Sequence, residues 1–435
     1  MTLKNKLAVF VFLFISVILV NCISGDNSGN GLIDIVEVNA IELQPPRYGE
    51  QDPAAETVAV GANAFAFRLS AMLARNIGDD NFVCSPYSIW LPLAALVNAA
   101  DVQYKAALLT ALGAAGIPEA DINRAASQML YDLTKMRAKE YGEYHNPLKI
   151  VNAIFAGNDV TIKNDFAQIF MDCYRGSSIN VDFSSPDALD AVNQWASENS
   201  DGLITNLVQE FPPLAVAVIA NAIYFFDRWE WKFDPEETEE RIFHAPSGET
   251  TAFFMLRESY SQAYYEDDRV QAMPLSFSNG GGMYIILPKT DSAAELVSSI
   301  SDNYFEEIRA NLIQASGKLL LPRFSIESNN QNLKETLEML GVPLFDKHSA
   351  PLTSGLIRED TPVYLSDVLQ KAAIHVDEEG TTAAAVTSMA GRALSIHRPV
   401  DNFEMICDKP FMFILFDHTY NGGAQIIFTG IVNKP

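Results

Sequence analysis

The sequence predicts one large domain of the α+β class, in which helices and strands are intermixed. Some stretches carry apolar residues at helical spacing, and others are short continuous apolar runs typical of buried strands. The two kinds of stretch do not alternate in the regular rhythm of a parallel α/β fold. In addition, no proline- or glycine-rich linker divides residues 60–435, so a single domain is expected there.

Composition and charge exclude several classes of protein. The chain has 435 residues, of which 48% are hydrophobic and 20% are charged, as in a soluble folded protein rather than a disordered one. Its 30 basic and 55 acidic side chains give a net charge of 30 − 55 = −25. Such a surface repels phosphate backbones and anionic lipid headgroups. Nucleic acid is therefore not an expected partner.

The first 21 residues predict a signal peptide. Lys4 and Lys6 precede an apolar run from Leu7 to Val20, which is shorter than the span of about 20 residues that a membrane helix needs. We therefore expect the chain to be secreted or otherwise exported from the cytoplasm. The run ends in Leu19-Val20-Asn21-Cys22, which resembles the lipobox of bacterial lipoproteins.

Two readings of Cys22 remain open. It is either a lipid-attachment site at a bacterial envelope, the only contact with a membrane that we expect, or an incidental residue after an ordinary signal peptide. The sequence contains no Asn-x-Ser/Thr glycosylation sequon, which favours a bacterial envelope. Without Cys22, three cysteines remain, an odd number that argues against a disulfide framework.

Residues 22–60 predict a flexible acidic tether, and residues 61–435 the folded domain. Residues 26–31 combine Asp, Asn, Ser and Gly, which is typical of an unstructured segment. Three helices are predicted after it from apolar spacing and end signals. These are a helix with Phe65, Leu69, Met72 and Leu73, a helix with Ser185 as N-cap, Pro186 in its first turn and Gly202 as its stop, and a helix with Leu333, Leu337 and Leu340 before Gly341.

Six apolar runs between these helices predict strands. They are Ile150–Phe155, Ala215–Phe225, Met283–Leu287, Leu319–Phe324, Phe411–Phe416 and Ala424–Val432. Asn421-Gly422 predicts a hairpin turn between the last two runs. Gly280-Gly281-Gly282 lies between strand-like runs, so it predicts a hairpin tip rather than a phosphate-binding loop.

Motifs of enzymes are missing from the sequence. It contains no Gly-x-Ser-x-Gly, His-Glu-x-x-His, Cys-x-x-Cys or Gly-x-Gly-x-x-Gly motif. The six histidines are scattered singly, without a second histidine or cysteine at the spacing of metal ligands. We therefore expect no catalytic residue, no metal and no cofactor.

The segment 380–391 is unusual because it carries no charge and consists almost entirely of small side chains. A flexible linker or a short alanine-rich helix would account for this composition. Threonine, valine and methionine are nevertheless uncommon in linkers.

This segment resembles the hinge and reactive-centre loop of the serpins, the serine protease inhibitor family. Other motifs that resemble serpin motifs occur in serpin order along roughly residues 60–435. They are Asn81–Ile89, Val181-Asp182-Phe183, Asn193-Gln194-Trp195, Asn221–Phe225, Trp229 with Phe233, Leu321–Phe324, Leu333–Leu337, Leu365–Val368 and Asp408–Phe411. The resemblance implies a large central mixed sheet, two further sheets, about eight to nine helices and an exposed loop at about residues 378–400.

The resemblance also implies roles for individual residues. The hinge, where the loop leaves the sheet, comprises Glu378, Glu379, Gly380, Thr381, Thr382, Ala383, Ala384, Ala385, Val386 and Thr387. The shutter, which gates the sheet from below, comprises Ser85, Ser88, Asn221 and Gln370, and Gln370 stands where many serpins have histidine. The breach, where insertion begins, is marked by Trp229, and Asp227 stands where a glycine is common.

The family mechanism implies a loop that is cut by a serine protease and then enters the sheet as an extra strand. Alternate side chains of a strand face opposite sides, so Thr381, Ala383, Ala385, Thr387, Met389 and Gly391 would share the buried face. None of these six is charged, and a charge there would be buried without a partner. Arg392 falls on the opposite face.

The family's spacing from Gly380 implies that the reactive bond joins Leu394 and Ser395. An apolar Leu394 favours chymotrypsin-like or elastase-like proteases, which would be held as a covalent acyl complex on a monomeric inhibitor. Arg392 is the alternative reactive residue and would admit trypsin-like proteases. A non-inhibitory serpin that acts as a carrier, chaperone or binding module, and a protein that is merely cut as a substrate, are the remaining alternatives.

Overall fold

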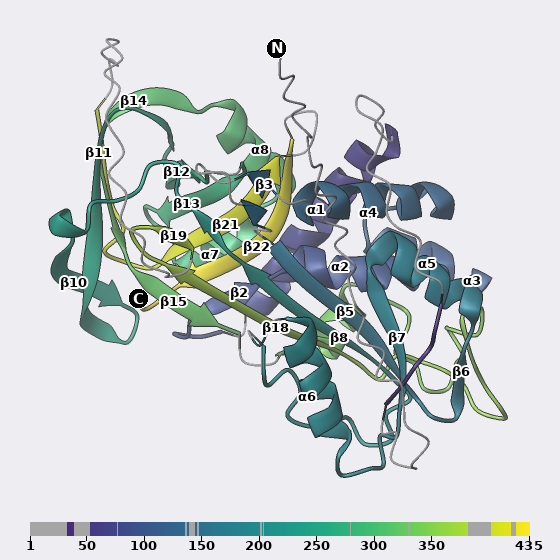
Figure 1. Ribbon diagram of the computed structural model, residues 1–435. Helices are drawn as coiled ribbons and strands as arrows, with labels where there is room; N and C mark the ends of the chain where they lie inside the picture. The colour runs from purple at the N-terminus through teal and green to yellow at the C-terminus, as the bar shows by residue number, and fades with distance from the viewer. Residues whose placement is uncertain are drawn as a thin grey trace, which may run out of the picture.

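The central element of the fold is a mixed seven-stranded sheet (Figure 1). A computed structural model describes residues 33–38, 53–75, 77–134, 137–138, 144–145, 148–200, 202, 204–278, 280–328, 331–381, 402–418 and 423–435. The sheet has the order β1 (Ile33–Ile35), β7 (Gly176–Val181), β5 (Leu148–Gly157), β8 (Ala217–Phe225), β18 (Asp367–Val376) and β15 (Phe324–Glu327), with β16 (Gln331–Asn332) also on β18. The two middle strands, β8 and β18, are parallel and directly paired.

A second sheet of nine strands combines the two further sheets that the family resemblance implies. Its order is β2 (Phe82–Cys84), β22 (Ala424–Val432), β21 (Phe411–His418), β13 (Gly282–Pro288), β12 (Val270–Ser276), β11 (Gly248–Glu266), β14 (Ile313–Pro322) and β20 (Asn402–Ile406), with β10 (Glu239–Ala245) on β11. The 19-residue strand β11 joins them, because it pairs with β10 and β14 and, at its end, with β12.

Helices cover both faces of the central sheet. Within the described residues they are α1 (Pro53–Ala74), α2 (Pro86–Ala95), α3 (Val102–Ala111), α4 (Glu119–Thr134), α5 (Asn164–Tyr174), α6 (Ala188–Asn199), α7 (Ala293–Ser299), α8 (Asp302–Ala310) and α9 (Lys334–Met339), with a 3₁₀ turn at Pro235–Glu237. Helix α6 packs on one face, where the Trp195 ring meets Phe155 edge-on at 5.2 Å. Helix α2 packs against β5 and β8 on the other face.

Among the described helices, α1 alone is long and apolar enough to span a membrane. However, 61% of its most apolar 18-residue stretch is buried inside the protein, as in a core helix.

Three short strand pairs complete the described structure. They are β3 (Arg137–Ala138) with β4 (Tyr144–His145), β6 (Val160–Ile162) with β17 (Leu356–Arg358), and β9 (Asp227–Arg228) with β19 (Gly380–Thr381). In the last pair, the segment just after β8 pairs with the segment just after β18.

Most of the elements predicted from sequence are confirmed, with small shifts. Each of the six strand-like runs corresponds to a strand, although the run Ala215–Phe225 begins two residues before β8 and Arg323 divides the fourth run between β14 and β15. Gly280 and Gly281 have φ values of 100° and 68° between the antiparallel strands β12 and β13, which confirms a hairpin tip. Strands β21 and β22 are antiparallel, but the turn predicted at residues 421–422 lies outside the described residues.

The prediction of Ser185 as a helix N-cap is wrong by two residues. Helix α6 begins at Ala188 with Asp187 at the N-cap position. Ser185 Oγ instead accepts a hydrogen bond from the backbone N–H of Asp187 at 3.3 Å. The serine therefore stabilises a turn before the helix, a role that such side chains share with capping.

The tether predicted at residues 22–60 ends too late and contains a strand. Helix α1 already begins at Pro53, and residues 33–35 form β1 on the edge of the central sheet. The backbone N–H of Val36 also donates to Ser178 O at 3.0 Å. Ile33 packs against the apolar cluster beneath the sheet, so an open sheet edge orders a segment whose flanking composition indicates disorder.

Candidate functional site

Three buried amide side chains lie in one row across three strands of the central sheet. Asn152 on β5 is directly opposite Asn221 on β8, and Asn221 is opposite Gln370 on β18. Asn221 Nδ2 donates to Asn152 Oδ1 at 2.6 Å, and Gln370 Nε2 lies 3.0 Å from Asn221 Oδ1. Their exposed fractions are 3% or less. The row therefore links the middle strands by side chains as well as by backbone.

The N-terminus of α2 closes this row from below. Ser85 caps the helix, and its backbone N–H donates to Gln370 Oε1 at 3.1 Å. Gln370 Nε2 lies 2.9 Å from both Ser85 O and Ser88 Oγ, while Ser88 Oγ donates to Asn221 Oδ1 at 2.6 Å. Ser85 Oγ donates to Ile427 O at 2.7 Å. The four predicted shutter residues thus form one buried network, and Gln370 supplies both a donor and an acceptor to it.

Sequence reasoning missed Asn152. The residue interrupts the otherwise apolar run Ile150–Phe155 in β5, and a lone amide at a buried strand position needs a buried partner. That interruption is the signal by which it could have been found.

At the head of the sheet, Trp229 holds the chain that follows β18. Its ring is 1% exposed and stacks on Phe277 at 4.9 Å with an interplanar angle of 12°. The indole Nε1 donates to Asp377 O at 2.8 Å, and the backbone N–H donates to Glu379 O at 3.0 Å. The breach tryptophan and the start of the hinge are therefore in direct contact.

Two ion pairs fix the first hinge residues. Arg323 donates to the Glu378 carboxylate with contacts of 2.6–2.9 Å, and Thr238 Oγ1 donates to the same carboxylate at 2.5 Å. Burial by itself would raise the pKa of Glu378, but the hydrogen bonds from Arg323 and Thr238 outweigh it and lower the pKa. Lys232 pairs with Glu379 at 2.6 Å. Ion pairs to Arg323 and Lys232 therefore hold the hinge where it leaves the sheet.

The next two hinge residues are already paired as a strand. Gly380 is opposite Arg228, and Thr381 is opposite Asp227, in antiparallel register. Thr381 is fully buried, and its Oγ1 accepts from the Asp227 backbone N–H at 3.0 Å. A Cβ at position 380 would lie 2.2 Å from Asp227 O, so only glycine permits this approach.

Between the hinge and the shutter, the sheet is closed. The direct pairing of β8 with β18 runs from Val218 opposite Asp367 to Tyr224 opposite Ala373. An additional strand could enter here only by breaking these pairings. The expected remainder of the hinge (Thr382, Ala383, Ala384, Ala385, Val386 and Thr387), the reactive residues Leu394 and Ser395, the alternative Arg392, and Cys22 all lie outside the described residues.

The described residues contain no group of three or more His, Cys, Asp or Glu side chains arranged to hold a metal ion. The described cysteines, Cys84, Cys173 and Cys407, are free thiols. Burial raises the pKa of each of them, so none has the activated thiolate of a nucleophile.

Most of the chain is similar to known proteins. A family profile described as Serpin (serine protease inhibitor) matches residues 60–435. The uncharacterized serpin-like protein TK1782 of Thermococcus kodakarensis is 28% identical over 395 residues, which cover 89% of this chain and 87% of the relative. Alpha-1-antitrypsin 1-4 of Mus musculus is 28% identical over 392 residues, which cover 89% and 91%. The native structure of the thermophilic serpin tengpin superposes with a TM-score of 0.77 at 26% identity, covering 92% of this chain and 98% of tengpin.

Proposed function

Because this chain belongs to the serpin family and has the serpin fold, we propose that it inhibits serine proteases of the chymotrypsin or elastase type. Members of this family are typically protease inhibitors without enzymatic activity of their own. The cleaved loop would insert between β8 and β18 and trap the acyl-enzyme before water releases the protease. The observation that carries the proposal is the docked pair of Gly380 and Thr381 at the head of these two strands.

The register of this docked pair supports insertion. Because the strands are antiparallel, the position numbers of opposite residues have a constant sum. Extension from Thr381 opposite Asp227 brings Thr387 opposite Asn221. On the other side, Asp377 N donates to Gly380 O at 3.0 Å, and extension of that turn brings Thr387 opposite Gln370. Since Asn221 and Gln370 are themselves opposite each other, both extensions agree.

Insertion in this register would break one contact of the shutter and supply a replacement for it. The contact that would be broken joins Gln370 Nε2 to Asn221 Oδ1, which are 3.0 Å apart in the closed sheet. Thr387 would share the buried face with Thr381, because their positions differ by an even number. A threonine hydroxyl both donates and accepts, so it could bond to the two amides that it separates.

New backbone hydrogen bonds would supply the free energy of insertion. A strand placed between β8 and β18 replaces one paired interface with two, a gain on the order of ten bonds at about 1 kcal/mol each. This is comparable with the whole stability of a typical domain, about 5–15 kcal/mol. Insertion would therefore be effectively irreversible and could distort an attached protease.

An experiment with chymotrypsin and trypsin tests the proposal. After incubation, a denaturing gel distinguishes a covalent adduct, expected of an inhibitor, from a cleaved band alone, expected of a substrate. An intact chain would indicate a non-inhibitory carrier, chaperone or binding module. Sequencing of the released C-terminal peptide is expected to start at Ser395, whereas a start at Ala393 would assign the reactive bond to Arg392.

The same proposal includes export of the protein. Lys4, Lys6 and the apolar run that follows support a signal peptide, and Cys22 is the residue that would carry a lipid. Replacement of Cys22 by serine would release a lipid-anchored protein from the membrane fraction and would leave the distribution of a secreted one unchanged.

A further inference from the structure

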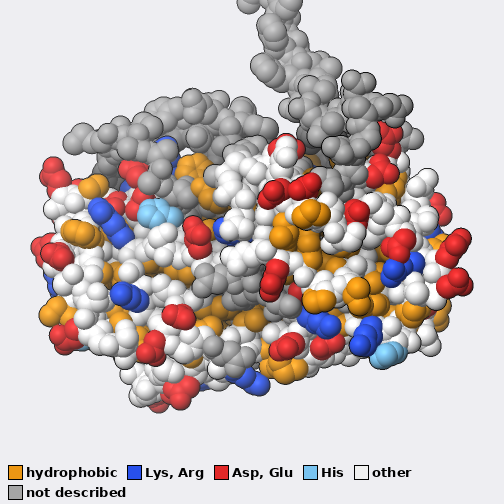
Figure 2. All heavy atoms as spheres, turned by 90° about the horizontal axis from the view of Figure 1, so that it is seen from below, with side chains coloured by type: hydrophobic (Ala, Val, Ile, Leu, Met, Phe, Trp, Pro, Cys, Tyr) orange, Lys and Arg blue, Asp and Glu red, His pale blue; other side chains and the backbone are white. Residues whose placement is uncertain are grey.

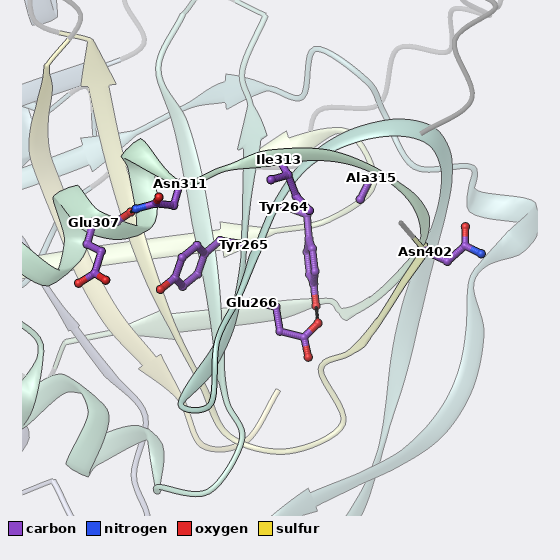
Figure 3. A pocket seen from close by; sticks show the side chains of 8 residues that line it. All are labelled: Tyr264, Tyr265, Glu266, Glu307, Asn311, Ile313, Ala315 and Asn402. Carbon is purple, nitrogen blue, oxygen red and sulfur yellow. Dashed lines mark hydrogen bonds between the residues drawn. The ribbon is translucent and has the colours of Figure 1, made fainter. Parts of the chain in front are cut away.

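The chain is held differently at Thr381, where β19 ends, and at Asn402, where β20 begins. Asn402 lines a pocket of about 510 Å³ between β11, α8 and β14 (Figure 3). The tyrosines of this pocket, Tyr264 and Tyr265, are 4% and 8% exposed, and Tyr264 already stacks on Phe403. The pocket therefore offers no open ring face to a ligand, whereas Thr381 follows an ordered turn.

This turn reverses the chain between β18 and β19. Strand β18 ends at Val376, and β19 begins at Gly380. The backbone N–H of Asp377 donates to Gly380 O at 3.0 Å. In an ordinary hairpin with a two-residue turn, the flanking residues exchange a second backbone bond in the opposite direction. Here Gly380 N donates instead to the Asp377 carboxylate, 3.2 Å from Oδ1, so the side chain completes the closing pair.

The same carboxylate also fixes the middle of the turn. Asp377 Oδ1 accepts from Glu379 N at 2.9 Å, while Asp377 O accepts from the Trp229 indole Nε1 at 2.8 Å. An aspartate that accepts from the backbone just after it stabilises a turn, and bonds to a charged acceptor are stronger than neutral ones. The Asp377 side chain is 14% exposed, so water competes weakly for these bonds.

The second oxygen of Asp377 faces a histidine. His375 Nε2 lies 3.6 Å from Asp377 Oδ2, and the His375 side chain is 40% exposed. This distance is too long for a hydrogen bond, and an ion pair so open to solvent contributes little to stability. The two oxygens therefore have separable roles, since Oδ1 holds the turn and Oδ2 faces the histidine.

The turn lies where insertion of the cleaved loop would begin. Strand pairing that continues from Asp377 opposite Gly380 brings Thr387 opposite Gln370. A turn that is already closed removes the entropy cost of bringing its ends together. Each later pair of the inserting strand then forms beside one that exists.

We propose that Asp377 is a positioning residue for loop insertion. Its carboxylate keeps the turn closed, so that the cleaved loop enters in one register and outpaces hydrolysis of the acyl-enzyme. This inference rests on the proposed function and adds to it a residue that precedes the uncharged segment 380–391. Asp377 acts through the backbone of Glu379 and Gly380, not through contact with the protease.

Three substitutions separate the turn bonds from the ion pair. Asp377→Ala removes both, Asp377→Asn keeps an oxygen that accepts from the turn, and His375→Gln removes the ion pair alone. Each variant is incubated with chymotrypsin, and a denaturing gel gives the ratio of cleaved chain to covalent adduct. Asp377→Ala is expected to raise this ratio about tenfold through loss of charge-assisted bonds. Asp377→Asn is expected to restore most of the loss, and His375→Gln to leave the ratio unchanged.

The association rate distinguishes positioning from general damage to the protein. Insertion follows acylation, so the rate at which each variant first reacts with chymotrypsin is expected to stay unchanged. If Asp377→Ala does not fold, Asp377→Glu takes its place, because the extra methylene moves the carboxylate away from the turn, and it should raise the ratio as well. Failure of Asp377→Asn to restore adduct, or slower association in proportion to the lost adduct, would overturn the positioning role.

Equal ratios for Asp377→Ala and the unchanged protein would overturn this role while leaving the inhibitor function intact. Insertion can also be followed without inhibition, as the rate at which the cleaved chain becomes resistant to heat. If the unchanged protein forms no adduct but gains this resistance, the inhibitor proposal fails. The turn proposal then stands only if Asp377→Ala gains it more slowly than His375→Gln does. Absence of any gain after cleavage would overturn both.

Discussion

At the scale of single residues, the buried amide network links three neighbouring strands of the central sheet through side chains. Gln370 Oε1 accepts from one backbone N–H, and the two hydrogens of its Nε2 are shared among three oxygen atoms within 3.0 Å. Removal of a buried partner costs more than the bond itself, because the groups left behind are desolvated and unpaired. The network is therefore sensitive to the loss of this one side chain.

Replacement of Gln370 by alanine is expected to lower the free energy of unfolding by about 2–3 kcal/mol. Urea denaturation measures this loss. The matched control is Gln194→Ala on α6, since Gln194 is exposed and bonds only to Glu198 at 2.8 Å among its described contacts. A shift no larger than that of the control would show that the shutter network does not hold the sheet.

The lowered pKa of Glu378 predicts that the stability of the folded protein depends on pH. Its pKa in the folded protein is lowered from the ordinary value of 4.5, so the folded state binds the proton more weakly than the unfolded state does. The contribution of the Arg323 pair is therefore fully present above about pH 4.5 and is lost as the pH falls through the lower, folded pKa. Thermal midpoints of the unchanged protein and of Glu378→Gln are expected to differ at pH 7 and to converge at strongly acidic pH. A difference that persists in acid would assign the effect to packing.

At the scale of elements, the short pair of β9 and β19 commits the hinge to one register. Thr381 is fully buried there, opposite Asp227. The Asp227 carboxylate lies in the same buried turn, where its Oδ1 accepts from Arg228 N at 2.8 Å. If the proposed insertion continues this register, a charged side chain on the face shared with Thr381 would be buried at a large cost.

Replacement of Thr381 by arginine is expected to convert the inhibitor into a substrate. Thr381 is fully buried and its Oγ1 accepts from the Asp227 backbone N–H, so the much larger arginine would overfill this position and lose that bond. Delayed insertion would then let the protease complete hydrolysis. On denaturing gels, the covalent adduct should give way to a cleaved band. The control is Thr382→Arg, which the strand alternation places on the opposite face, and it should retain the adduct. Adduct from both variants in equal yield would contradict insertion in this register.

The edge strand β1 offers a second test at this scale. Ile33 packs beneath the sheet, whereas Ile35 on the same strand is 43% exposed. Ile33→Asp is expected to reduce the free energy of unfolding by about 1–2 kcal/mol through lost apolar burial, and Ile35→Asp by less than about 0.5 kcal/mol. Chemical denaturation of both variants measures the difference. Losses below about 0.5 kcal/mol for both variants would mean that the packing of β1 adds nothing to stability.

At the scale of the whole molecule, the proposed mechanism requires the central sheet, which is closed between β8 and β18, to gain a strand after cleavage. Cleavage at Leu394–Ser395 is expected to raise the thermal unfolding midpoint, because the inserted loop adds backbone hydrogen bonds on both of its sides. Calorimetry of the intact and the nicked protein measures this change. An unchanged or lower midpoint after cleavage would contradict the proposed trapping mechanism.

The charge of the molecule acts at the same scale. Figure 2 shows acidic side chains spread over one face, with basic side chains between them. A net charge of −25 distributed in this way raises encounter rates with basic proteins only diffusely.

By itself, the sequence determined the class of fold, the six strand-like runs, the glycine hairpin at residues 280–282 and the uncharged segment 380–391. These features are local, because apolar spacing and turn residues can be read within a short window. Only the tertiary structure decided that Asn152 completes the shutter, that Ile33 orders a strand on an open edge, and that Glu307 and Asn402 share a pocket. Each of these depends on a partner far away in the chain, and the pattern around a residue does not identify the partner that folding brings to it.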